Sequence, residues 1–176
     1  MCGLGGRLVG FLASKAIEYV CCDPAKPQIN GNKRIYELFN PYTPFEKKVS
    51  FNCTPFEKYE NPDNYFDMAI TSPPYFDVED YVGGAQSHKE YSNYDLWVEK
   101  FYSVLIKKTY NALKDNGVFV LQVGNQKYPL ATDAIKIAEK IGFILMSRED
   151  AGMGNNIVNT SDEDKETALV FKKYKQ

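Results

Sequence analysis

The sequence predicts an α/β fold, in which helices cover both faces of a sheet. Segments with the apolar spacing of helices alternate with short apolar segments along the 176 residues, a pattern typical of layered α/β folds. A glycine-rich turn at residues 3–6 leads directly into a helical segment. Two of the short apolar segments run into turn residues, at 23–24 and at 72–74. These turns predict that the functional groups gather where strands end.

The first half of the chain is expected to hold two helices and three strands. Residues 7–17 have an apolar side at helical spacing, and the apolar run 18–22 is a strand that ends in an Asp-Pro turn. Residues 32–40 form a short helix that stops before a proline, since proline disfavours helical backbone in the residue before it. Apolar residues alternate along 48–53, and 65–71 is an apolar run that leads into two consecutive prolines. Both are expected to be strands.

The second half begins with a long polar and aromatic loop at 76–94. The longest helix is expected at 95–113, where Trp97 and Phe101 lie at core spacing. A strongly apolar strand follows at 117–123. The remaining elements are a helix at 130–141 that a glycine ends, and strands at 143–147 and 168–172 joined by the polar segment 151–165.

Composition suggests one domain, residues 1–176, of an ordinary globular protein: 44% of the residues are hydrophobic and 25% charged. The absence of an apolar run of about 18 residues predicts no membrane span, so a cytoplasmic location is the default expectation. The net charge of −2 argues weakly against a nucleic-acid partner, because Lys and Arg supply non-specific affinity for phosphates. The four cysteines form no CxxC pair and only one histidine is present, so we expect reduced thiols and no metal site.

The glycine turn at 3–6 has the features of a nucleotide-binding turn. Glycines allow a ligand to approach the backbone closely, and the helix that follows offers unpaired N–H groups. Asp23, at the end of the next strand, lies 18 residues beyond Gly5, where a carboxylate can bind ribose hydroxyls. Thr54 and Phe56 directly follow the strand expected at 48–53, so they would lie along the same sheet edge. Phe56 could cover an adenine ring there. The alternatives are a turn acid at Asp23 and a hydrophobic anchor at Phe56.

The segment Thr71-Ser72-Pro73-Pro74-Tyr75 is the most specific feature of the sequence. An aromatic amine is a poor nucleophile, because its lone pair is delocalised into the ring. Prolines lack the backbone N–H, so this segment presents acceptors, the Ser72 hydroxyl and the Pro73 carbonyl, with few competing donors. Tyr75 offers a flat face on which a base extruded from its helix can stack. The alternative is a rigid loop after a strand.

These two motifs, at 2–8 and 71–75, resemble those of the amino-methyltransferases of DNA, the cytosine-N4 and adenine-N6 methylases. The resemblance covers nearly the whole chain. It implies a Rossmann-like methyltransferase sheet of seven strands, whose last two are antiparallel partners, and S-adenosylmethionine as the donor for direct in-line transfer to a DNA base. The implied catalytic residues are Ser72, Pro73, Pro74 and Tyr75. The implied cofactor-binding residues are Cys2, Gly3, Gly5, Asp23, Pro24, Thr54 and Phe56.

The sequence departs from the pattern of that family in three respects. The first strand, which precedes the glycine turn in such folds, is missing from the chain, so we expect truncation, a partner chain or self-association that supplies it, or an adapted fold. No separate recognition domain is visible. Ser72 stands where Asp or Asn is common in adenine enzymes, which favours cytosine-N4 without deciding the base. No cysteine follows a proline, which argues against the thiolate chemistry of cytosine-carbon methylation.

Two other functions remain open from the sequence. The first is methylation of an amine in RNA or in a protein glutamine, although Ser72 counts against it. The second is a methyltransferase-like subunit that has no activity alone. Among weaker candidates, the loop 76–94 either contacts an extruded nucleobase or forms a lid. His88 is not expected to act as a catalytic base. Gln122 and Asn125 are expected in core or turn roles, with the lining of the nucleobase pocket as the alternative.

Overall fold

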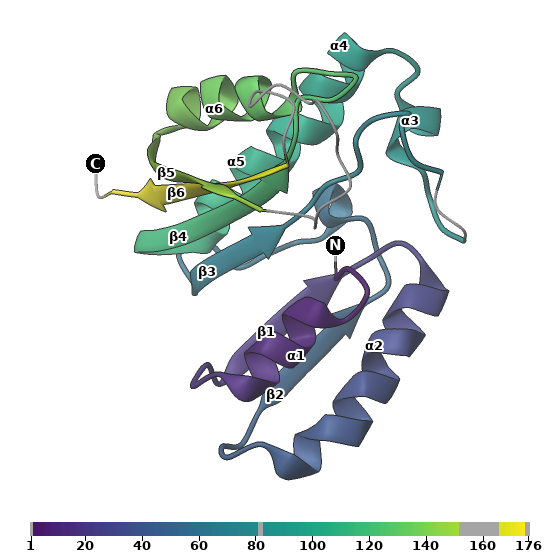
Figure 1. Cartoon of the computed structure of the whole chain (residues 1–176), viewed down its shortest axis with the longest axis vertical. Coiled ribbons are helices and arrows are strands. Elements are labelled where there is room, and N and C mark those ends of the chain that lie inside the picture. Colours follow the sequence, from purple (N-terminus) through teal and green to yellow (C-terminus); the bar gives the residue numbers. More distant parts are fainter. Residues whose placement is uncertain (1, 81–82, 152–165, 175–176) are drawn as a thin grey trace. The chain divides into compact units, whose positions relative to one another are not determined.

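The computed structural model describes residues 2–80, 83–151 and 166–174 of the chain. These residues divide into two compact units (Figure 1). Unit 1 contains Met1–Tyr59 and Tyr81–Gln86, and unit 2 contains Glu60–Asp80 and Ser87–Gln176. The expectation of one catalytic domain stays a prediction, and each unit is described by itself.

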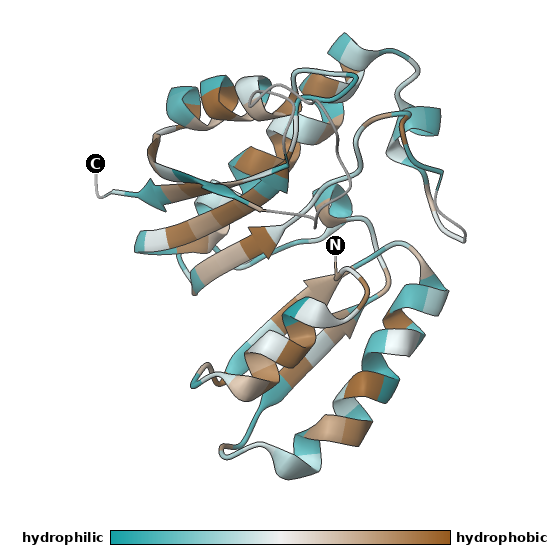
Figure 2. Ribbon diagram, viewed as in Figure 1, coloured by the Kyte–Doolittle hydropathy of each residue, from teal (hydrophilic) through white to brown (hydrophobic). Residues whose placement is uncertain are grey.

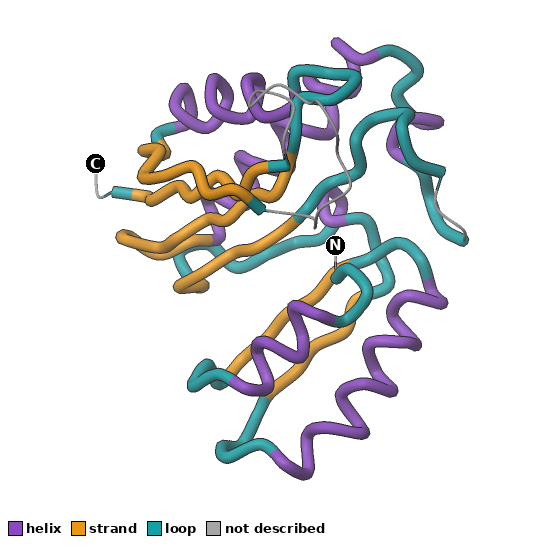
Figure 3. Tube along the Cα trace, viewed as in Figure 1, coloured by secondary structure: helices purple, strands orange, loops and turns teal. Residues whose placement is uncertain are grey.

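Unit 1 is built on two parallel strands, β1 (Glu18–Cys22) and β2 (Lys48–Asn52). Helices α1 (Gly6–Ala13) and α2 (Lys26–Phe39) pack against them (Figure 3). Leu8, Phe11 and Leu12 of α1 form a buried cluster, against which Tyr19 of β1 and Phe51 of β2 pack. Two short 3-10 turns, Asn40–Tyr42 and Phe56–Lys58, follow α2 and β2.

Unit 2 contains a four-stranded sheet in the order β3-β4-β6-β5. β3 (Phe66–Thr71) is parallel to β4 (Leu113–Val123), whereas β6 (Thr167–Lys173) is antiparallel to both β4 and β5 (Phe143–Asp150). The helices of this unit are α3 (Ser87–Glu90), α4 (Tyr94–Trp97), a π-helical turn Val98–Tyr102, α5 (Ser103–Ala112) and α6 (Leu130–Ile141).

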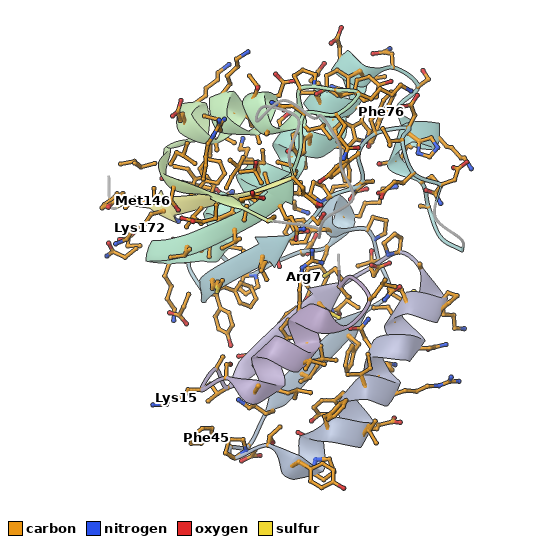
Figure 4. The ribbon with its side chains drawn as sticks, in the orientation of Figure 1. Arg7, Lys15, Phe45, Phe76, Met146 and Lys172 are labelled. Carbon is orange, nitrogen blue, oxygen red and sulfur yellow. The ribbon has the colours of Figure 1, made fainter. Side chains whose placement is uncertain are left out.

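The two faces of the unit 2 sheet differ sharply. One face carries fully buried Phe119 and Phe171, and α5 and α6 contact the strands that bear them (Figure 2). On the other face Met68, Ile70 and Ile144 are exposed by 55%, 43% and 50%. The pairing register puts four residues of this face in one row across the sheet: Met68, Val118, Lys172 and Ile144. Lys172 is labelled in Figure 4, together with Met146 of β5. Burial on a single face is typical of antiparallel and mixed sheets, whereas the strands at 65–71 and 117–123 were predicted from their apolar runs.

The structure confirms most of the expected elements and corrects several. The strand at 18–22 and the helix at 130–141 have the expected bounds. Helix α2 begins at Lys26 rather than at residue 32, because Pro27 lies in its first turn, where a helix tolerates the missing N–H. The long helix expected at 95–113 is interrupted by the π turn, and the loop 76–94 contains α3. Most of segment 151–165 lies outside the described residues.

No helix within the described ranges is long and apolar enough to cross a membrane. The same residues contain no group of three or more His, Cys, Asp or Glu side chains arranged to hold a metal ion.

Candidate active site

The glycine turn of unit 1 is a tight, left-handed segment packed against α2. Gly3 and Gly5 have φ angles of 64° and 100°, a region that only glycine adopts without strain. A Cβ atom on Gly5 would collide with Cδ1 of Ile35 in α2. The turn at 3–6 therefore requires glycine at position 5 for its backbone angle, and a larger residue there would also displace the end of the Ile35 side chain.

Two side-chain amides of α2 hold the Gly3 carbonyl. Nδ2 of Asn32 donates to this oxygen at 3.1 Å, and Nε2 of Gln28 donates to the same oxygen. Asn32 is 0% exposed, and its amide also donates to the Gln28 carbonyl one helical turn earlier, at 3.0 Å. Neither residue was predicted as part of the site: Gln28 lies before the expected start of the helix at residue 32, and Asn32 was expected only as its first residue. Two amides four residues apart on the helix after the first strand are the signal that could have revealed them.

Asp23 connects the end of β1 to the glycine turn. Its carboxylate is 8% exposed, with Oδ2 accepting a hydrogen bond from the Cys2 N–H at 3.3 Å and Oδ1 accepting one from the Ala25 N–H at 3.0 Å. The second of these bonds is the turn role foreseen as the alternative for Asp23. Each carboxylate oxygen can accept a further bond, so the turn role leaves acceptor capacity for a ligand hydroxyl.

Thr54 and Phe56 follow β2 at the same edge of the unit 1 sheet. The parallel register of β1 and β2 brings their carboxyl ends together, and the Asp23 N–H donates to the Asn52 carbonyl at 3.0 Å. Thr54 and Phe56 are both half-buried. Unit 1 thus gathers all the candidate cofactor residues near one sheet edge: Cys2, Gly3, Gly5, Asp23, Pro24, Thr54 and Phe56.

In unit 2, the proline motif follows the carboxyl end of β3. Pro73, Pro74 and Tyr75 are buried, whereas Ser72 is half-buried. The Thr71 hydroxyl is buried and has no hydrogen-bond partner among the described residues. The prolines and Tyr75 are therefore packed into unit 2, whereas Ser72 remains partly accessible to solvent.

Tyr75 is held by a residue that the sequence analysis did not single out. Its hydroxyl donates to Oε1 of Glu166 at 3.1 Å, and Nε2 of Gln122 donates to the same oxygen at 2.9 Å. Gln122 lies next to the end of β4, and Glu166 directly precedes β6. The end of β4 and the start of β6 are neighbours, since Gln122 pairs with Ala168 and Val123 with Thr167.

Phe76 anchors the motif from its other end. It is buried, with a positive φ of 56° that is uncommon for a bulky residue. Its ring contacts those of Tyr94, Trp97 and Tyr128, with centroids at 5.8, 5.7 and 5.2 Å, and Phe76 is labelled in Figure 4. Tyr94 and Tyr128 stack on each other at 4.6 Å. This aromatic cluster holds the backbone directly after Tyr75 in one conformation.

Two polar contacts hold residues of the aromatic cluster and of the loop after Phe76. The Tyr94 hydroxyl donates to Oδ2 of Asp133 at 2.8 Å, and burial together with this carboxylate raises the pKa of Tyr94. Next to Phe76, Asp77 forms an ion pair with Lys127 at 2.9 Å, and the hydrogen bond from Lys127 lowers the pKa of Asp77. These contacts join the motif loop to the segment before α6.

The weaker candidates take other positions. Asn125 has a turn role, because its Oδ1 accepts from the N–H groups of Ala131 at 2.8 Å and of Thr132 at 3.3 Å in the first turn of α6. His88 lies 3.3 Å from an Asp80 carboxylate oxygen. Residues 81–82 of the loop 76–94, and residues 152–165 of the polar segment, lie outside the described residues.

Comparison with known proteins decides the family. The family model described as DNA methylase matches residues 66–176, which include the whole proline motif and most of unit 2. The chain belongs to the DNA methylase family. A curated relative of the chain, the Type II beta methyltransferase M.BslI of Bacillus sp. (strain NEB-606), is 28% identical over 99 residues. The match covers 48% of this chain but only 10% of that protein, so the chain spans about a tenth of its relative.

Solved structures confirm the α/β, Rossmann-like fold class of the chain. A protein of Methanosarcina mazei described as a SAM-dependent methyltransferase superposes with a TM-score of 0.68 at 14% identity, over 99% of this chain and 90% of that one. The [4+2]-cyclase SpnF superposes with a TM-score of 0.65 at 13% identity, over 98% of this chain and 72% of that one. Because a cyclase shares the fold, the fold alone does not define the reaction.

Proposed function

We propose that the chain is the catalytic part of a DNA amino-methyltransferase that uses S-adenosylmethionine. It transfers a methyl group to an exocyclic amine of a DNA base, N4 of cytosine or N6 of adenine. Membership of the DNA methylase family supports the reaction class. The observation that carries the specific proposal is the proline motif at the end of β3, with its prolines and Tyr75 buried and Ser72 accessible.

The motif supplies what an aromatic amine needs in order to react. The Ser72 hydroxyl and the Pro73 carbonyl accept hydrogen bonds from the amine, which favours the pyramidal geometry in which its lone pair is available. Neither proline contributes an N–H donor that would compete for these acceptors. The Tyr75 ring provides the stacking surface for an extruded base. The motif acts by positioning, a contribution that depends on its rigidity.

The residues at the unit 1 sheet edge fit a nucleoside-like donor. S-adenosylmethionine supplies a methyl group activated by a positively charged sulfur. Asp23 retains acceptor capacity for ribose hydroxyls, and the glycine turn leaves room beside the first turn of α1, where a Cβ atom on Gly6 would meet nothing within 4 Å. Phe56 would cover the adenine of the donor, and Thr54 follows β2 at the same edge.

Direct transfer is the reaction course that suits the cysteines of the chain. Cys2, Cys21 and Cys22 are buried in unit 1, and Cys53 follows β2 in the same unit. The proline motif contains no thiol. The covalent intermediate of cytosine-carbon methylation therefore has no thiolate nucleophile within the motif.

The test is transfer of radiolabelled methyl groups from S-adenosylmethionine to DNA duplex, single-stranded DNA, RNA and protein in parallel. Digestion of the labelled DNA to nucleosides distinguishes N4-methylcytosine from N6-methyladenine. Ser72→Ala should lower the rate roughly tenfold or more, the effect of losing one well-placed hydrogen bond. Ser147→Ala on β5 is the matched control and should retain the wild-type rate. Label found in RNA or protein but not in DNA would overturn the DNA assignment.

A second candidate, activity that requires another polypeptide, is favoured by the strand pairing. Among the strands of the described residues, β1 and β2 pair only with each other, and β3 pairs only with β4. A further strand from a partner chain or a second copy would pair with such an edge. Activity that rises steeply with chain concentration, or that appears only on co-expression with a second polypeptide, would support this candidate. A restriction-modification system is a suitable setting for either candidate.

A further inference from the structure

We propose that Glu166 is a positioning residue that fixes the Tyr75 ring as one wall of the target-base site. The proposal rests on the function proposed above, in which Tyr75 stacks on the base. Glu166 lies outside the proline motif and is separated from Tyr75 by 91 positions in the sequence. It acts on the reaction only through Tyr75.

The Glu166 carboxylate accepts two hydrogen bonds on one oxygen. The Tyr75 hydroxyl donates to Oε1 at 3.1 Å, and the Gln122 amide donates to the same atom at 2.9 Å. A carboxylate oxygen can accept both bonds, and bonds to a charged acceptor are stronger than neutral ones. Gln122 thereby holds the carboxylate in the position from which it reaches Tyr75.

Glu166 is itself held by the backbone. Its carbonyl accepts a hydrogen bond from the Ala151 N–H at 3.0 Å, just beyond the last β5–β6 pair, between Asp150 and Thr167. Gln122 pairs with Ala168 in the neighbouring ladder. The contacts of Glu166 with Tyr75 and Gln122, called the clamp below, are therefore held by residues whose backbones belong to the sheet or directly adjoin it.

The tyrosine ring needs a constraint of this kind. Pro74 before it and the buried Phe76 after it fix the backbone, which leaves rotation about the two side-chain torsions of Tyr75. A hydrogen bond at the tip of the ring restricts the first torsion, because it fixes the position of the hydroxyl. Rotation about the second torsion leaves the hydroxyl in place, so the plane of the ring is held by the packing around this buried side chain. The contact with Glu166 thus keeps the ring in one position relative to the motif, and a well-positioned ring is what stacking of a base requires.

A purely structural role would give different results from a positioning role. A buried hydroxyl needs a partner whatever its function, so loss of Glu166 would then lower stability and leave the turnover of the folded protein unchanged. Loss of a positioning residue changes turnover in the folded protein. Glutamine at position 166 retains an acceptor oxygen and should therefore preserve the clamp, whereas alanine should not.

The first experiment compares kcat and KM of the full chain for Glu166→Ala, Glu166→Gln, Tyr75→Phe and the double variant Tyr75→Phe/Glu166→Ala. We expect Glu166→Ala to lower kcat roughly tenfold, as for one hydrogen bond to a charged group, with KM for S-adenosylmethionine unchanged. Glu166→Gln should restore most of the rate. The double variant should be no slower than the slower single variant, since both remove the same contact. Additive losses, or an unchanged kcat in Glu166→Ala, would overturn the proposal.

The second experiment does not depend on activity. In protein with ¹³C at Cζ of tyrosine, the Tyr75 resonance is identified by its loss in Tyr75→Phe. Glu166→Ala should shift this resonance, Glu166→Gln should shift it less, and Glu139→Ala on the exposed face of α6 should leave it in place. A resonance that Glu166→Ala does not move would show that the contact does not exist. If the wild-type chain methylates no DNA while this resonance responds as expected, the proposed function fails and the clamp stands.

Discussion

Replacement of Asp23 tests the candidate cofactor residues of unit 1 most directly. In Asp23→Ala, the N–H groups of Cys2 and Ala25 lose the acceptors that lie 3.3 and 3.0 Å away, at a position where the carboxylate is 8% exposed. Any ligand hydroxyl loses the same acceptor. Leaving a buried polar partner unsatisfied costs about 1–3 kcal/mol, which corresponds to roughly 5- to 150-fold weaker binding of S-adenosylmethionine.

Calorimetric titration with S-adenosylmethionine measures this change. The matched control is Glu37→Ala, which removes an exposed carboxylate on α2 of the same unit and should leave the dissociation constant unchanged. Thermal melting of each variant establishes that the protein titrated is folded. Equal affinities of wild type and Asp23→Ala would refute the role of Asp23. Absence of saturable binding by the wild-type chain at millimolar ligand would refute a working cofactor site in this chain alone.

Two further predictions concern stability and can be measured by urea unfolding. Gly5→Ala should destabilise by about 1–2 kcal/mol or more and weaken the cofactor turn, because position 5 has a φ of 100° and its Cβ would strike Ile35; Gly6→Ala, with nothing within 4 Å, should be neutral or stabilise by up to about 1 kcal/mol, and equal effects would contradict the packing argument. Lys173→Met should cost about 2–5 kcal/mol, because Nζ of this buried lysine donates to Oδ1 of Asn64 and to the carbonyls of Tyr110 and Leu113 at 2.8, 3.0 and 2.7 Å. The neighbouring Lys172→Met, on the exposed face of the sheet, should change the free energy of unfolding by less than about 0.5 kcal/mol. A larger loss of stability there than in Lys173→Met would contradict the structural role of the Lys173 hydrogen bonds.

The parts of the fold that the sequence predicted are those set by local pattern. The strand at 18–22 is an apolar run closed by Asp23-Pro24, and the helix at 130–141 has a continuous apolar side and a terminal glycine. Both were predicted with their observed bounds. The proline motif was also placed correctly after β3, because an apolar strand leads directly into it.

The parts that could not be predicted depend on contacts between distant residues. Whether a proline starts a helix or breaks it depends on the rest of the first turn, so Pro27 was taken to lie outside α2. The π turn at Val98–Tyr102 shifts the apolar side of the helix without leaving a local signal. The positive φ of Phe76 results from packing against Tyr94, Trp97 and Tyr128, and nothing in the sequence around Phe76 indicates it.

The two units solve the same physical problem in similar ways. Unit 1 has a left-handed glycine turn before α1, unit 2 has the proline motif at the carboxyl end of β3, and each unit holds its motif with side chains from later in the chain. Gln28 and Asn32 of α2 hold the glycine turn, and Glu166 with Gln122 holds the proline motif. A motif with a stiff or left-handed backbone has few local bonds of its own, so its geometry depends on such distant donors and acceptors. A variant that retained both motifs but lost Asn32 and Glu166 would therefore still match the family by sequence and would have neither site in working geometry.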